Sequence, residues 1–380
     1  MREPIPGPGS IRDTAAQTAE SVSTACPPDY YYGPATLNRP PDLSAETLYV
    51  IGGLYGNPEA LAAVLAMKDR EDRAGPTEGA QMRPPVRSTV RPPVRPPVRL
   101  VFNGDFNWFN VDAESFRAIN AAVLEHVAIQ GNVEAELARE GAALDCGCNY
   151  PPYVDPGTVE RSNRIFARLK ETASHSPGIA SRLGGMPKTL VARVGAHRIA
   201  IVHGDPEALS GWRLAEEALS GPNAKEDAPP GVPQTGEERI AEYFRASGVT
   251  AFAATHTCLP FARDFTVDGQ ARLIVNNGAA GMPNFRGVAG GLLTRISVRP
   301  ALPGGSLYGW VSDGVHYDAL PVPYDQKRWM ERFLANWPEG TPAHRSYFER
   351  LTNGPDYTLE QAVRGGVRRA GEGAPTRRTA

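Results

Sequence analysis

The sequence predicts a layered α/β protein with a mixed β-sheet, or two stacked sheets, and helices outside. In the first half of the chain, apolar segments of strand length alternate with helical patterns. From residue 188 onward strands dominate, and TLVARV-GA-HRIAIVH is typical of a hairpin. Several apolar strands also end at a polar residue beside Gly or Thr, and ligands of open α/β sheets bind at such strand ends.

Apolar runs and helical periodicity place the individual elements along the chain. The first strand runs into Gly52-Gly53 and then into a helix. Strands are expected at 47–52, 99–103, 188–194, 197–203, 249–254, 272–276, 291–298, 306–312 and 315–320. Helices are expected at 58–69, 113–126, 132–140, 157–172, 206–219, 236–247 and 325–336.

Composition divides the chain into one main domain, 46–300, with less regular segments around it. Residues 1–45 are rich in Pro, Gly, Ser and Thr without periodicity, which predicts a disordered leader. The segment 71–99 repeats Arg-Pro-Pro-Val and predicts an inserted polyproline II loop, because proline fixes φ and lacks the N–H donor. A hairpin and helical extension is expected at 301–364, and a disordered basic tail at 365–380.

The Arg-Pro-Pro-Val repeat has two interpretations. It is either a ligand for a protein partner with a proline-recognising module or a repeat expansion in a surface loop, and the second is the more common.

Overall composition is that of a soluble globular protein. The 380 residues are 41% hydrophobic and 22% charged, and the net charge of −2 argues against an extended nucleic-acid surface. There is no run of 18 apolar residues and no secretory signal, so we expect neither a membrane span nor export. Four cysteines are too few for a disulfide framework at this length. We therefore expect a cytoplasmic protein.

Four further strand ends carry polar side chains that suit a metal ion. They are Gly104-Asp105, Gly131-Asn132, His203-Gly204-Asp205 and Thr255-His256-Thr257-Cys258. Asp and His are ordinary metal ligands, and an Asn carbonyl suits a hard cation. Because strand ends share one edge of a sheet, the pattern predicts a metal site there.

In this order the motifs resemble those of the calcineurin-like metallophosphoesterases, which run D-x-H, G-D-x-x-D, G-N-H-[DE], H-G and G-H-x-H. The resemblance covers residues 47–290 and includes the closing strand and turn, LIVNNGAAGMPNF. It implies a four-layer α-β-β-α sandwich of two mixed sheets flanked by helices. It also implies hydrolysis of phosphoesters with two metal ions that clamp the phosphate.

One of the two metal sites implied by the resemblance is degraded in this chain. Gly53 and Tyr55 stand at the Asp and His of D-x-H, and Cys258 stands at the last His of G-H-x-H. Of that site only Asp105 remains. Trp108 replaces the second Asp of its motif.

The other site is complete: Asp105, Asn132, His203 and His256 match all four ligands. The resemblance therefore implies one divalent ion rather than two, with Mn, Fe, Zn and Mg not distinguished, and the same four residues as the catalytic centre. Val133 replaces the histidine that the family uses near the leaving group.

Each of these residues taken alone also has a structural interpretation. Asp105 could cap a turn, His203 could be a hydrogen-bonded core histidine, and Asn132 could cap the helix that follows. Jointly they favour coordination. Asp205 could orient His203, donate a proton in place of the missing histidine, or cap the helix expected at 206–219.

Other polar residues remain open. Cys146 and Cys148 are spaced for a shared metal ion or a redox pair, and their Gly/Pro-rich loop could cover the site as a lid. A structural pair of reduced thiols is the favoured interpretation. Tyr55 could join Asp105 and Cys258 in a small second metal site, a less favoured alternative. The tryptophans, Trp108 and Trp212, either line a substrate pocket or fill the core.

Two functions follow. The first is a phosphoester hydrolase that acts on a phosphorylated small molecule or another phosphoester, weakened or altered because it has one metal ion. The second is a non-catalytic protein that binds a phosphorylated ligand or a protein partner. In that case Gly52, Gly53 and Gly56 could offer backbone N–H groups to a phosphate at the start of the helix expected at 58–69.

Overall fold

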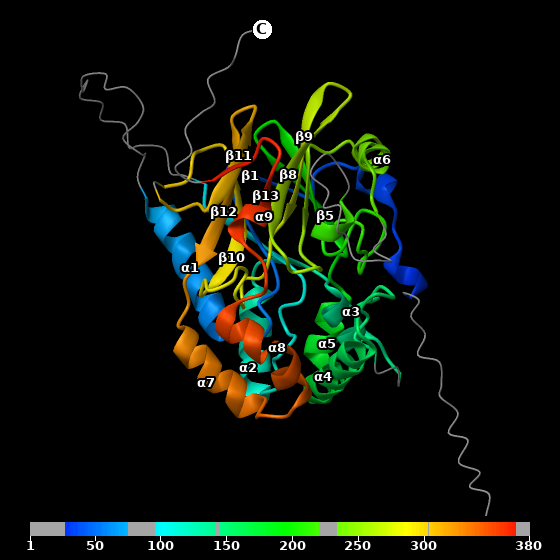
Figure 1. The fold of residues 1–380 in the computed structure, drawn as a ribbon, viewed down its shortest axis with the longest axis vertical. Coiled ribbons are helices and arrows are strands. Elements are labelled where there is room, and N and C mark those ends of the chain that lie inside the picture. Colours follow the sequence, from blue (N-terminus) through cyan, green and yellow to red (C-terminus); the bar gives the residue numbers. More distant parts are fainter. Residues whose placement is uncertain (1–26, 75–95, 142–144, 220–233, 303, 370–380) are drawn as a thin grey trace, which may run out of the picture.

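The computed structural model describes residues 27–74, 96–141, 145–219, 234–302 and 304–369. Two mixed seven-stranded sheets pack face to face between helices, which is the predicted four-layer α-β-β-α sandwich (Figure 1). Within the described residues, no helix is both long enough and apolar enough to cross a membrane. The first sheet has the order β1-β5-β6-β7-β9-β8-β13, and the second has the order β14-β11-β12-β10-β2-β3-β4.

Each sheet contains a parallel group of three strands, which lies at the centre of the first sheet and at one edge of the second. The strands of the first sheet are β1 (Leu43–Ala45), β5 (Thr189–Val194), β6 (His197–Val202), β7 (Ala251–Ala254), β8 (Phe261–Val267), β9 (Gln270–Asn276) and β13 (Val363–Arg364). Those of the second are β2 (Thr47–Ile51), β3 (Arg99–Asn103), β4 (Val127–Ile129), β10 (Gly291–Ser297), β11 (Tyr308–Ser312), β12 (Val315–Val322) and β14 (Arg368–Arg369). In the first sheet β7 pairs in parallel with β6 and β9, and in the second β3 pairs in parallel with β2 and β4.

Strand β2 illustrates why two apolar layers form. Its side chains alternate between the two faces, as the pleat requires. Leu48 and Val50 lie in the apolar cluster between the sheets, whereas Tyr49 and Ile51 lie in the cluster under the helices. All of its residues are buried, which fits a central strand covered on both faces.

Helices cover the outer face of each sheet (Figure 1). The helices whose buried residues belong to the apolar cluster on the outer face of the second sheet are α1 (Pro58–Arg73), α2 (Ala113–Val123), α3 (Asn132–Ala138), α4 (Pro156–Ser174), α5 (Pro177–Gly184), α7 (Gln326–Asn336) and α8 (Pro342–Asn353). The first sheet is covered by α6 (Glu237–Ser247) and the 3-10 helix η2 (Pro34–Leu37). The remaining short helices are η1 (Pro28–Tyr30), η3 (Glu216–Ala218) and α9 (Leu359–Ala362).

The helix expected at 206–219 is wrong. Residues 206–215 form a loop, and only η3 follows it. The reason is Asp205, whose carboxylate accepts hydrogen bonds from the backbone N–H groups of Glu207, Ala208 and Arg213. Those bonds fold the chain into a compact loop in place of a helical turn.

The boundaries of the irregular segments also differ from expectation. Residues 27–45 are not a disordered leader, because β1 pairs with β5 and Tyr30 is buried. The expected tail contains β14, which pairs with β11 through Arg368 and Arg369. Most of the Arg-Pro-Pro-Val repeat, together with residues 1–26 and 370–380, lies outside the described residues.

Candidate metal centre

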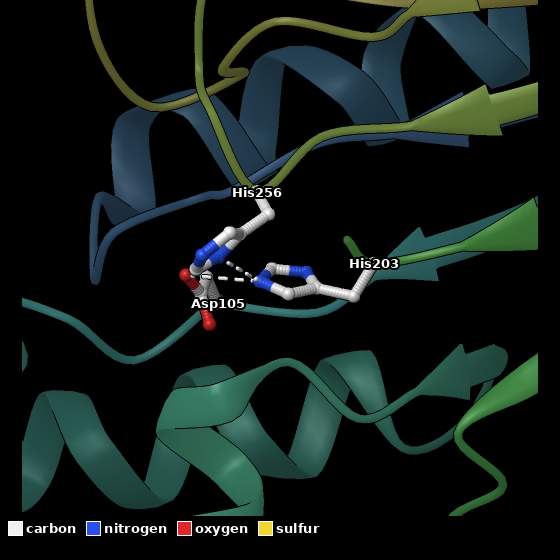
Figure 2. Close-up of side chains that lie close together, drawn as sticks. All are labelled: Asp105, His203 and His256. Carbon is white, nitrogen blue, oxygen red and sulfur yellow. Dashed lines mark hydrogen bonds and ion pairs between the residues drawn. The ribbon is translucent and has the colours of Figure 1, made fainter. Parts of the chain in front are cut away.

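Three ionisable side chains meet where β3, β6 and β7 end. They are Asp105, His203 and His256, and one ligand atom from each lies within 4.8 Å of the others. All three are buried, with exposed fractions of 7%, 0% and 8%. Figure 2 shows the two imidazoles and the carboxylate converging from three separate loops. The strand-end prediction therefore places these residues together correctly.

The His203 ring lies at the centre of the group. Its Nε2 atom is 3.2 Å from Nδ1 of His256 and 3.3 Å from Oδ2 of Asp105 (Figure 2). The amide oxygen Oδ1 of Asn132 is 3.1 Å from the same nitrogen. These four residues are called the four-residue cluster below.

Both histidines use their far nitrogen to donate to the backbone. His203 Nδ1 lies 2.8 Å from the carbonyl oxygen of Asn103, and His256 Nε2 lies 3.0 Å from that of Cys148. A carbonyl oxygen can only accept, so each of these nitrogens carries the proton. In the neutral imidazoles, His203 Nε2 and His256 Nδ1 therefore face each other with lone pairs.

The two other members of the cluster are also oriented by the surrounding chain. Asn132 donates its side-chain amide to the carbonyl oxygen of Cys146 at 2.8 Å and to Sγ of Cys148 at 3.3 Å, so its oxygen is directed at His203. Asp105 accepts a bond from the backbone N–H of Val133 at Oδ1, and Oδ2 faces His203. Asn132 is the first residue of α3 and does not cap it; Gly131 holds that position.

Four acceptor atoms thus meet without a donor among them. Only a cation can satisfy all four, either a proton on one ring or a metal ion. Burial lowers the pKa of His203, but the Asp105 carboxylate outweighs burial and leaves that pKa raised. Burial and the charge on His203 lower the pKa of His256 to about 4. Two imidazoles, a carboxylate and an amide oxygen, with carbonyls behind the rings, fit a divalent cation.

A buried carboxylate that the sequence analysis missed holds the Asp105 turn. Glu134 accepts the N–H groups of Asp105 at 2.6 Å, Phe106 at 3.1 Å and Gly131 at 3.2 Å. Asp105 has a φ of 52°, a conformation that side chains rarely adopt, so the turn needs this support. Burial, and then the charge of Asp105, raise the pKa of Glu134 to about 7. The spacing Gly131 to Glu134 is that of a capping box, which is the signal in the sequence.

The first corner, residues 52–57, is filled by its own tyrosine. The Tyr55 hydroxyl lies 2.6 Å from Sγ of Cys258. A Cβ atom added to Gly53 would lie 2.5 Å from the Tyr55 ring. The three positions where the resemblance implies missing ligands are therefore neighbours, and an aromatic ring occupies the space between them.

The structure bears on both alternative uses of the first corner. Burial, then the charges of Cys258 and Asp105, raise the pKa of Tyr55 well above its usual value, which disfavours the phenolate that a metal ion would need. Of the three glycine N–H groups considered for a phosphate, that of Gly56 already donates to the carbonyl oxygen of Phe106.

The remaining sequence candidates have structural contacts. Asp205 accepts three backbone N–H groups, as described above, and does not line the cavity beside the cluster. Cys146 and Cys148 are free, buried thiols 2.6 Å apart. Their loop contacts the cluster directly, since Cys148 accepts from His256 and Trp212 through its carbonyl oxygen.

A cavity of about 330 Å³ opens beside the cluster. Asp105 and His256 line it, together with Val133 and the positions Tyr55 and Cys258. The other lining residues are mainly aromatic or basic, with four small side chains among them: Trp108, Tyr150, Trp212, Tyr347, Arg161, Arg345, Arg350, Cys148, Thr158, Thr257 and Ser346. Trp108 and Trp212 were candidates for this role from the sequence. The residues of α8 were not, because the sequence analysis did not predict that helix.

No protein-family model matches the chain, and no curated protein matches it. Among solved structures, it is similar to a hypothetical protein from Pyrococcus horikoshii OT3, with a sequence identity of 16% and a TM-score of 0.47. That alignment covers 82% of this chain and 99% of the other. The chain is also similar to a metallophosphoesterase from Sphaerobacter thermophilus, with 16% identity, coverage of 82% and 100%, and a TM-score of 0.45. What the cluster can bind must therefore be decided from its own side chains.

Proposed function

We propose that this protein is a metal-dependent phosphoester hydrolase that holds one divalent cation at the four-residue cluster. The observation that carries the proposal is the meeting of four atoms, from Asp105, Asn132, His203 and His256, that are all acceptors when both imidazoles are neutral. Such an arrangement is costly in a buried place unless a cation completes it. The resemblance of the motif order to the calcineurin-like metallophosphoesterases supports the same assignment.

One ion rather than two is proposed because the neighbouring space is filled. Tyr55 and Cys258 contact each other where further ligands would be needed. Burial raises the pKa of both groups, which disfavours the anionic forms that bind metal ions. Asp105 alone is left on that side, and one carboxylate does not make a metal site.

The cavity beside the cluster suits a phosphorylated small molecule. Arginine side chains line it, and guanidinium groups bind phosphate well. When bound, the ion would act as a Lewis acid on a phosphoryl oxygen. The chain itself would position the ester, while the indole and phenol rings exclude water from part of the cavity.

Turnover is expected to be weak. Val133 lines the cavity where the resemblance implies a histidine, and an alkyl side chain cannot protonate a leaving group. Esters with good leaving groups, such as aryl phosphates, need that proton least and should react best. The lack of a proton donor at Val133 also favours the second candidate, a protein that binds a phosphorylated ligand without hydrolysing it.

The test uses purified protein loaded with Mn²⁺ and an aryl phosphate monoester and diester. The His256→Gln variant should lose both bound metal and turnover. His197→Gln is the matched control, because His197 is also buried but contacts Tyr317 and Asp313, away from the cluster. Metal binding without turnover in the wild type would support the binding protein. Wild-type turnover that survives in His256→Gln would contradict the proposed site.

A further inference from the structure

Arg350, on helix α8, lies beside the first corner and faces the same cavity as the four-residue cluster. Its Nη2 atom donates to the carbonyl oxygen of Cys258 at 3.1 Å. The chain between β7 and β8 therefore fixes the guanidinium next to Cys258, which in turn contacts Tyr55. Asp105 and His256 line the cavity as well.

The guanidinium has no acidic partner among the residues that the structure describes. Its Nη2 atom donates to a neutral carbonyl oxygen, and its Nε atom is buried without a hydrogen-bond partner. The side chain is half-buried and lines the cavity, so an anion in the cavity would supply the missing counter-charge.

Charge balance says what kind of anion fits. A divalent cation bound by Asp105 leaves one net positive charge at the cluster, and Arg350 adds another on the Cys258 side. The phosphoryl group of a monoester carries close to two negative charges at neutral pH. A diester carries one. The cluster with its ion and Arg350, taken together, thus match the charge of a monoester.

We propose that Arg350 is the second cationic group of the site and, together with the ion at the four-residue cluster, binds the phosphoryl group of a phosphate monoester. This inference rests on the proposed function. Guanidinium and phosphate form paired, charge-assisted hydrogen bonds, and Arg350 has Nε and Nη groups to donate. Its charge would also stabilise the charge that develops during the reaction.

The experiment measures two properties of the Mn²⁺-loaded protein: binding of inorganic phosphate by calorimetry, and hydrolysis of an aryl phosphate monoester and diester. The variants are Arg350→Gln and Arg350→Lys, with Arg345→Gln to test a second cavity arginine. Arg328→Gln is the control, because Arg328 lies on α7, pairs with Glu59 and does not line the cavity. Bound metal and the thermal melting temperature are recorded for each variant.

Arg350→Gln should weaken phosphate binding about 10-fold or more and lower kcat/KM for the monoester about 100-fold, as losses of a donor to transition-state charge do. The kcat/KM of Arg350→Gln for the diester should fall less than that for the monoester. Arg350→Lys keeps the charge without the planar fork and should fall between wild type and Arg350→Gln. Metal content should stay the same in all of them, and Arg345→Gln should lose less than Arg350→Gln.

The inference is overturned if Arg350→Gln binds phosphate as tightly as the wild type does. It is also overturned if Arg345→Gln loses as much phosphate affinity as Arg350→Gln. Wild-type protein that binds no phosphate overturns it as well. If Arg350→Gln does not fold, Arg350→Lys decides, and wild-type affinity in that variant counts against the inference. Failure of the proposed function has a different signature: wild-type protein without bound metal or without turnover, whatever Arg350 does to phosphate binding.

Discussion

The ring nitrogens Nε2 of His203 and Nδ1 of His256 face each other 3.2 Å apart, while each ring donates its only N–H to a backbone carbonyl on its far side. Two neutral imidazoles cannot hydrogen-bond in that arrangement, because neither facing nitrogen carries a proton. Backbone carbonyls behind metal-bound histidines fix the rings in this way. The pair is therefore prepared for a cation between the rings.

Asp105→Asn should fold but bind the metal ion weakly. An amide at this position still accepts the N–H of Val133 and can donate to His203, but it removes the negative charge. At an ion concentration of about 100 times the wild-type Kd, binding raises the free energy of unfolding of the wild type by about 2.7 kcal/mol. If the variant's Kd is about 100-fold higher, the same concentration raises its free energy of unfolding by only about 0.4 kcal/mol. Chemical denaturation with and without Mn²⁺ measures the difference.

Asp112→Asn is the matched control for that variant. Asp112 caps α2 by accepting the N–H of Ser115, and asparagine caps helices equally well. Its metal-dependent stabilisation should equal that of the wild type. A similar loss in both variants would mean that the Asp105 result does not report on the cluster.

Gly53→Asp alone should destabilise the fold and add no metal. The new Cβ would lie 2.5 Å from the Tyr55 ring, so either the ring or the turn must move, at a cost of about 1–3 kcal/mol. The triple variant Gly53→Asp, Tyr55→His, Cys258→His removes the ring and supplies three ligands. Its metal content should rise from one to two ions per chain by elemental analysis. A triple variant that folds and still holds one ion would show that the first corner is not the lost site.

Glu134→Gln should weaken metal binding indirectly, because Glu134 supports the turn that holds Asp105. One carboxylate oxygen accepts the N–H groups of Asp105 and Gly131, and the other accepts that of Phe106. An amide has only one acceptor oxygen, so its NH₂ group would face a donor at one of the two positions. Loss of that support should raise the metal Kd about 10-fold, as is usual for residues behind a ligand. Glu136→Gln is the control, since Glu136 lies on the same helix but contacts Tyr30 and Arg139. An equal metal Kd in the two variants would count against a role for Glu134.

Val133→His should raise turnover, if the missing proton donor limits the reaction. Val133 lines the cavity at the start of α3, and its backbone bond to Asp105 does not depend on the side chain. General acids contribute about 10²-fold or more, so an increase of about 10-fold is expected even from imperfect geometry. Val133→Leu controls for added volume. No gain with a poor leaving group, in protein that still folds and binds metal, would contradict this explanation.

The sequence predicts the layers well because strand and helix periodicity are local. The run 47–52 into Gly53 and the helix after it appear as β2 and α1 nearly as expected. The helix at 206–219 fails because local propensity gave no sign of the three bonds that Asp205 accepts. Helix α8 was not predicted because its apolar face is short. Its start, Thr341 followed by Pro342, is a normal one.

In the candidate site, the positions of the ligands could be predicted from the sequence but their orientations could not. Asp105, Asn132, His203 and His256 each follow a recognisable strand end, so their positions could be predicted. Their hydrogen-bond directions could not, because the partners include carbonyl oxygens of residues far away in the sequence. Arg350 likewise reaches the cavity only through the packing of a C-terminal helix, which no motif marks.

A crystal structure of the protein soaked in Mn²⁺ shows directly whether four atoms bind one cation. One anomalous peak per chain is expected, about 2.0–2.4 Å from Nε2 of His203, Nδ1 of His256, Oδ1 of Asn132 and Oδ2 of Asp105. Two peaks, a peak at Cys146 and Cys148, or no peak in fully soaked crystals would contradict it.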